Sequence, residues 1–172
     1  MNRKKPSFKV AVTGVMSALA IALNFLESLM PASAFLPPGA KLGLSNVVVM
    51  TAAVQFGMPY AVTIALIKSL FVLITRGAVA FFMSAAGGIL SAFVISIIVK
   101  IKNQPFGCMG IGIIGALAHN LGQLGAAVVL LGEGAVISYG PYMFIFALVA
   151  GTFTGALLKF ALPVVLRLED KN

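Results

Sequence analysis

The stretch that decides the fold is 109–131, MGIGIIGALAHNLGQLGAAVVLL, which runs for 23 residues without an Asp, Glu, Lys or Arg. A helix needs about 20 predominantly apolar residues to cross about 30 Å of hydrocarbon, so this stretch predicts a membrane-spanning helix. Its middle nevertheless carries an imidazole and two carboxamides, at His119, Asn120 and Gln123. Polar groups at that depth are costly and usually face a bundle interior or a water-filled cavity. The stretch therefore also predicts one wall of a binding site.

The rest of the chain has the same apolar character. Of its 172 residues 60% are hydrophobic and only 9% are charged, with a mean hydropathy of +1.09. A soluble domain needs more charge to cover its surface, so we expect a multi-pass integral membrane protein. The net charge of +8 lies in short basic patches between apolar segments, a distribution typical of topology signals. Without a basic domain or an aromatic platform for bases, nucleic acid is not expected as a partner.

Six apolar segments predict an all-α fold, a bundle of six transmembrane helices in a single membrane domain, 1–172. The connections between them are short except at 31–42 and 132–140. Basic residues are concentrated before the first segment, after the fourth and at the C-terminus, so the positive-inside rule predicts that both termini are cytoplasmic. The helices are expected near 8–30, 43–57, 59–76, 79–100, 109–131 and 140–167.

Polar side chains from several of these segments predict a shared ligand site. Asn24 and Glu27 are three positions apart and therefore share one face of the first segment. Lys68 lies midway along the third segment, as His119 does along the fifth. Counted at 1.5 Å per residue, the polar groups share the outer half of the membrane, which predicts a pocket open to the outside. The predicted ligand-binding residues are Asn24, Glu27, Lys41, Asn46, Lys68, Arg76, His119, Asn120 and Gln123.

The charges of this set indicate the kind of ligand. The predicted site contains three basic residues and one carboxylate, namely Lys41, Lys68 and Arg76 against Glu27. This excess of positive charge predicts a ligand with negative charge or carbonyl acceptors on an apolar or aromatic body. Lys41 and Arg76 have a second interpretation, because long basic side chains near helix ends extend to the membrane interface. Lys68 lies too deep for that. Glu27 is expected to pair with a cation or a ligand donor, since an isolated buried carboxylate would become neutral.

Catalytic chemistry is not expected from these residues. The chain has four acidic residues, and only Glu169 and Asp170 are close in sequence. Prenyl-diphosphate chemistry needs clustered aspartates to hold magnesium against diphosphate, and no such cluster is present. A Gly-rich phosphate loop is also absent, and a single His does not suit a conventional metal site. We therefore predict no catalytic residue, no metal and no cofactor.

Small residues recur at four-residue spacing in four segments. Such stripes let membrane helices approach closely, either within one bundle or against a partner protein. The spacing alone leaves both interpretations open, and the first segment is the candidate for docking a partner. The stripes are Gly14, Ala18 and Ala22; Ser84, Gly88, Ala92 and Ser96; Ala118, Gly122 and Ala126; and Ala147, Gly151 and Gly155.

Three stretches carry a resemblance to a known family: KLGLSNV at 41–47, SAAGGILS at 84–91 and GALAHNLGQ at 115–123. With them the chain resembles the bacterial membrane family described as heptaprenyl diphosphate synthase component I, also called Gx transporters. That family tends to have Arg where Lys68 stands. In size and six-helix layout the family is similar to the substrate-binding S components of energy-coupling factor transporters.

The resemblance implies a set of partners and a bacterial plasma-membrane location. The stripe Gly14, Ala18 and Ala22 would dock a coupling transmembrane protein that carries two ATPase subunits, and the loop 31–42 would cover the ligand. The expected function is capture of a small-molecule substrate from the outer face, within membrane lipid. Two alternatives stay open: a non-catalytic accessory subunit linked to heptaprenyl diphosphate or menaquinone synthesis, and a stand-alone facilitator.

Overall fold

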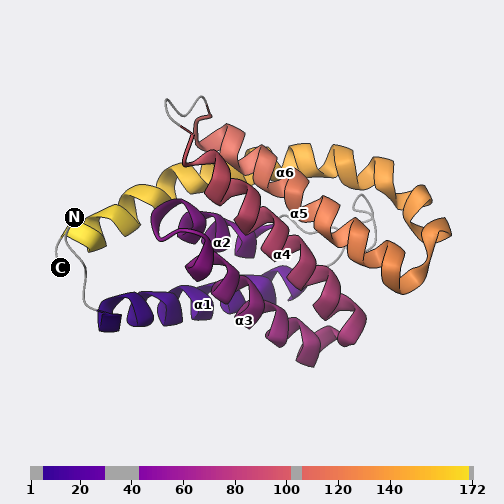
Figure 1. Cartoon of the computed structure of the whole chain (residues 1–172), viewed down its shortest axis with the longest axis horizontal. Coiled ribbons are helices and arrows are strands. Elements are labelled where there is room, and N and C mark those ends of the chain that lie inside the picture. Colours follow the sequence, from indigo (N-terminus) through magenta and orange to yellow (C-terminus); the bar gives the residue numbers. More distant parts are fainter. Residues whose placement is uncertain (1–5, 30–42, 102–105, 171–172) are drawn as a thin grey trace.

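The computed structural model describes residues 6–29, 43–101 and 106–170, which form six α-helices without a strand among them (Figure 1). This confirms the predicted all-α fold of six helices. The helices are α1 (Pro6–Leu29), α2 (Leu44–Gln55), α3 (Met58–Arg76), α4 (Ala78–Ile98), α5 (Cys108–Leu131) and α6 (Glu133–Asp170).

Five of the helices are long and apolar enough to cross a membrane, and α2 is the exception. Apolar side chains on their outer faces are widely exposed; Ile74 and Val129, for example, are each 84% accessible. Such continuous apolar surface suits contact with lipid rather than water. With 12 residues, α2 is about 18 Å long, which is shorter than the hydrocarbon layer.

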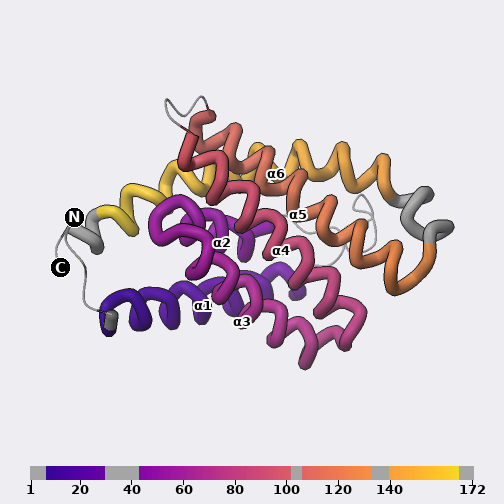
Figure 2. Tube along the Cα trace, in the orientation of Figure 1, coloured from indigo at the N-terminus to yellow at the C-terminus, as the bar shows by residue number. Residues whose placement is uncertain are grey.

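The short helix α2 lies at the centre of the bundle. It contacts all five other helices, and the tube trace shows it surrounded by them (Figure 2). Ser45 and every residue from Val47 to Ala53 are buried. Because α2 has neighbours on all sides, a polar group at its first turn is held inside the protein and not against lipid.

Three of the helix-to-helix turns rest on a glycine with positive φ. Gly57, Gly77 and Gly132 have φ values of +86°, +85° and +88°, a region that side-chain-bearing residues avoid. The N–H of Gly77 bonds to the Leu73 carbonyl at 3.0 Å, which ends α3. These turns join α2 to α3, α3 to α4 and α5 to α6 as tight hairpins.

The connection expected at 132–140 is not a loop. Helix α6 begins at Glu133, directly after Gly132, and continues through Pro141 and Pro163 to Asp170. The single left-handed glycine already reverses the chain, so no longer segment is needed.

The helix ends are arranged as an alternating bundle requires. The first turn of α1 and the last turn of α6 lie at the same end of the molecule, together with the α2–α3 turn (Figure 1). The α3–α4 and α5–α6 turns lie at the opposite end. The orientation proposed from the basic residues places the first of these ends in the cytoplasm.

The small residues of α4, α5 and α6 are packed inside the bundle. A Cβ added to Gly122 would lie 2.6 Å from the Ala86 carbonyl oxygen, and one on Gly155 would lie 2.7 Å from Met109 Cα. These distances are too short for any side chain, so glycine is what permits the backbones to approach. Close packing therefore accounts for these three stripes.

The stripe on α1 is different. Gly14, Ala18 and Ala22 are exposed, and a Cβ added to Gly14 would meet no atom within 4 Å. Among the described residues, α1 contacts α2 and α3 alone. Much of the α1 face that carries the stripe is consequently not covered by the described residues.

Candidate ligand-binding site

The start of α2 is held by a buried carboxylate from α1. Glu27 Oε1 accepts hydrogen bonds from the backbone N–H groups of Gly43 at 2.6 Å and Leu44 at 2.9 Å. The Ser45 hydroxyl lies 3.5 Å from the other carboxylate oxygen. First-turn amides have no acceptor within their own helix, and a negative charge there is favourable. Backbone amides thus fill a role for which the sequence suggested a cation or a ligand donor.

A buried lysine approaches the same turn of α2 from α3. Lys68 is only 2% exposed, and its Nζ donates to Asn46 Oδ1 at 2.7 Å. The N–H of Asn46 in turn bonds to the Gly43 carbonyl at 2.9 Å. The first turn of α2 therefore lies between an acidic side chain of α1 and a basic side chain of α3.

Asn24 belongs to the same region of α1. It is 4% exposed and lies three residues before Glu27, on the same helix face. The structure thus brings four of the predicted residues to the start of α2 or to the helix face beside it: Asn24, Glu27, Asn46 and Lys68. We call these four residues the α2 cluster.

Two further predicted residues lie where α5 packs against α4. A Cβ on Gly87 would lie 2.7 Å from the His119 carbonyl oxygen, 2.9 Å from His119 Cε1 and 3.0 Å from Gln123 Cγ. His119 is 7% exposed, and Gln123 is half-buried. Gly87 therefore admits the imidazole edge against the backbone of α4.

Asn120 faces another helix. Its Nδ2 donates to the Met143 carbonyl at 2.8 Å, which ties α5 to α6. This direction follows from the 100° rotation between successive residues of a helix, which separates Asn120 from His119. The hydrogen bond to the Met143 carbonyl is by itself a structural reason for an asparagine at position 120.

Two predicted residues remain. Arg76 lies apart from the α2 cluster and from the α4–α5 contact, and Lys41 falls outside the residues that the structure describes. Arg76 is exposed at the last residue of α3, about 12 Å along the helix from Lys68. Lys41 and the predicted lid 31–42 fall outside the described residues. Arg76 therefore does not join the α2 cluster in this structure.

Sequence reasoning missed a buried hydroxyl pair between α3 and α4. The Ser69 hydroxyl donates to the Ala65 carbonyl at 2.8 Å, and its oxygen is hydrogen-bonded to Ser84 Oγ at 2.9 Å. In the sequence analysis Ser84 belongs to a small-residue stripe and to the stretch SAAGGILS at 84–91, without a hydrogen-bonding role. Its signal was the spacing itself, because a Ser in such a stripe is both small and able to bond across helices.

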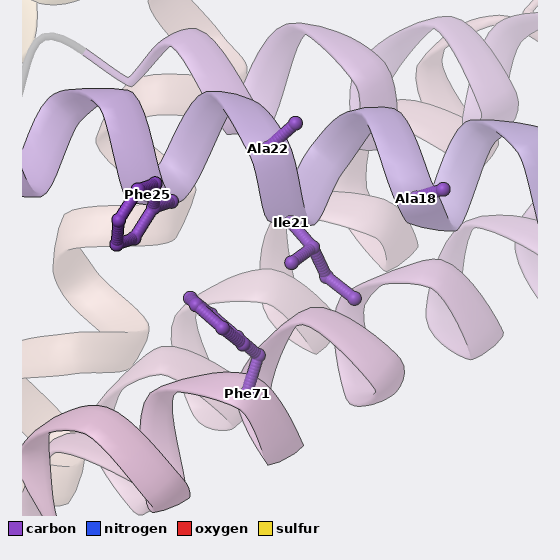
Figure 3. A pocket seen from close by; sticks show the side chains of 5 residues that line it. All are labelled: Ala18, Ile21, Ala22, Phe25 and Phe71. Atoms are coloured by element: carbon purple, nitrogen blue, oxygen red, sulfur yellow. The ribbon is translucent and has the colours of Figure 1, made fainter.

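A groove between α1 and α3 is lined only by apolar side chains. Its volume is about 480 Å³, and Ile21 and Phe25 of α1 and Phe71 of α3 point toward it (Figure 3). The Phe25 and Phe71 rings meet edge to face with centroids 6.4 Å apart. Ala18 and Ala22 complete the lining, so two of the three residues of the exposed α1 stripe border the groove.

The comparisons with known proteins give one family. A sequence model described as heptaprenyl diphosphate synthase component I matches residues 16–161, well over half of the chain. No curated protein and no solved structure gives a significant match. The matched range contains the α2 cluster, the α4–α5 contact and most of the six helices, and it confirms the resemblance seen in the sequence. The chain belongs to the heptaprenyl diphosphate synthase component I family.

Proposed function

We propose that this chain is a substrate-capturing membrane subunit, comparable to an S component of an energy-coupling factor importer. The observation that carries the proposal is that Glu27 and Lys68, from different helices, both bond to groups at the start of α2. Both side chains are more than nine-tenths buried in a bundle of membrane-type helices. Charged groups in that setting are expensive and mark ligand or ion sites.

The ligand that suits this site is small and carries anionic or carbonyl groups. Lys68 supplies an ammonium with three N–H donors, and charge-assisted bonds to acceptors are strong where water is excluded. Asn24, Asn46, His119, Asn120 and Gln123 are proposed to add directional hydrogen bonds. Lys41 and Arg76 are proposed to attract the ligand at the outer face, and Glu27 positions the α2 turn.

Transport by such a chain needs a partner that converts energy. Its sequence has no phosphate-binding loop, so ATP hydrolysis is assigned to two ATPase subunits acting through a coupling membrane protein. The exposed stripe of Gly14, Ala18 and Ala22 offers that protein a helix surface for close packing. The three other stripes are already used inside the bundle.

A second function is favoured by the family description. In this alternative the chain is a non-catalytic membrane accessory to heptaprenyl diphosphate or menaquinone synthesis, and the apolar groove of α1 and α3 contacts a prenyl chain. Its four acidic residues do not form the paired aspartate cluster that magnesium-diphosphate chemistry needs.

Purification of the tagged full-length chain from its own host in a mild detergent separates the two functions. Co-purification of ATPases with a second membrane protein is expected, together with a bound small molecule in native mass spectrometry. Recovery of a soluble prenyltransferase in place of the ATPases would support the accessory function. Uptake by vesicles containing this chain alone would instead point to a facilitator.

A further inference from the structure

Ser91 on α4 is a buried polar residue that the site described above does not use. It is 2% exposed, and its Oγ has no hydrogen-bond partner among the described residues. Hydroxyls on the other helices commonly bond to the carbonyl one turn back, as Ser17, Thr51 and Ser69 do at 2.8 Å. Ser91 does not use that local acceptor.

The contacts on either side of Ser91 fix its position. Gly87, one turn before it, packs against His119, and Ile95, one turn after it, lies beside Gly115. A Cβ on Gly115 would be 2.8 Å from Ile95 Cδ1 and 2.7 Å from Met50 Cε. Since α4 and α5 run antiparallel, Ser91 lies on the face toward α5, between the levels of Gly115 and His119.

A hydroxyl in that position is costly unless another group bonds to it. Burying a polar group without a partner costs its desolvation energy, and membrane-type bundles offer little bulk water to compensate. Buried hydroxyls of this kind are normally satisfied by ordered water or by a ligand. The imidazole of His119 packs against the same face of α4 one turn away, so a second polar side chain lies near Ser91.

We propose that Ser91 and His119 together hold one hydrogen-bonding oxygen atom at the α4–α5 interface. The oxygen belongs to an ordered water molecule or to a hydroxyl or carbonyl group of the captured ligand. If the oxygen belongs to the ligand, the inference rests on the proposed function, and Ser91 is a further ligand-binding residue. If the oxygen belongs to an ordered water molecule, the inference is independent of the proposed function.

The test compares Ser91→Ala with Ser17→Ala in the purified full-length protein. Ser17 is 4% exposed and bonds within its own helix, so its variant controls for the loss of a buried hydroxyl. If water occupies the site, Ser91→Ala lowers the Tm of the ligand-free protein by about 2–4 °C more than the control does. If the ligand supplies the oxygen, the ligand-free Tm matches the control, and retention of the co-purified small molecule falls about three- to tenfold.

One result would overturn the inference: a Tm for Ser91→Ala equal to or above that of Ser17→Ala, combined with unchanged ligand retention. That result would mean that the hydroxyl is buried without any partner. A wild-type protein that carries no small molecule would count against the proposed function, while the Tm comparison would still decide the water site. The two failures are therefore distinguishable.

Discussion

Glu27, near the end of α1, accepts a 2.6 Å hydrogen bond from the backbone N–H of Gly43, which precedes the central helix. Gly43 has a φ of +81°, so the chain enters α2 through a left-handed residue that favours glycine. The bond attaches the start of α2 to the same helix that carries the exposed stripe. The proposed ligand site and the surface proposed for a partner thus share one element, α1.

Replacing Glu27 should destabilise the protein in a graded way. Glu27→Ala leaves a buried amide, that of Gly43, and a part-buried one, that of Leu44, without this acceptor, which costs about 1–3 kcal/mol and lowers Tm by about 2–4 °C for each kcal/mol. Glu27→Gln keeps an acceptor oxygen but loses the negative charge, so an intermediate Tm is expected. Thermal unfolding in detergent measures the series, with Ser28→Ala at the exposed neighbouring position as control. Wild-type stability in Glu27→Ala would contradict the capping role.

Lys68 should determine ligand retention more than folding. Lys68→Met preserves a side chain of similar length, so the bundle should still form. Loss of the ammonium should reduce retention of the native small molecule about tenfold or more. Native mass spectrometry provides the measurement, and Lys159→Met, at an exposed position on α6, is the matched control. Equal retention by both variants would remove Lys68 from the site.

Substitution by alanine should lower the stability of the protein at Gly87 but not at Gly14. At Gly87 a Cβ would lie 2.7 Å from the His119 carbonyl oxygen, so Gly87→Ala must push α4 and α5 apart, at a cost of about 1–3 kcal/mol. At Gly14 nothing lies within 4 Å, so Gly14→Ala should be neutral or slightly stabilising through helix propensity. Tm values of the isolated protein compare them. A destabilised Gly14→Ala would show that this face is covered within the chain.

Two alanines of α1 should separate partner binding from folding. Ala22 is exposed beside the apolar groove, so Ala22→Leu should block close approach of a partner helix while leaving Tm unchanged. Ala20 is 0% exposed, so Ala20→Leu should overpack the core and lower the stability by about 1–3 kcal/mol. Co-purification of the ATPases and thermal unfolding are measured side by side. Undiminished co-purification with Ala22→Leu would place the partner on another face.

Much of the fold was predictable from the sequence because hydrocarbon thickness sets the length of an apolar helix. The third, fourth and fifth helices lie within a residue or two of their expected limits. The predicted loop at 132–140 was wrong, since nothing in the stretch GEGAVISYG shows that Gly132 alone, with its left-handed backbone, completes the turn. The binding roles of the nine proposed ligand residues stay predictions.

The sequence by itself determined that this chain forms apolar helices of membrane-spanning length and that a few polar side chains lie midway along them, because both follow from local composition and helical period. Only the tertiary structure decided which of those side chains meet. Glu27 binds amides 16 and 17 residues away, Lys68 bonds to Asn46 on another helix, and Asn120 faces α6. Four small-residue stripes are equivalent in spacing, yet three are packed and one is open. The reason is that the rotation of each helix about its axis is fixed by its neighbours, and no single helix encodes it.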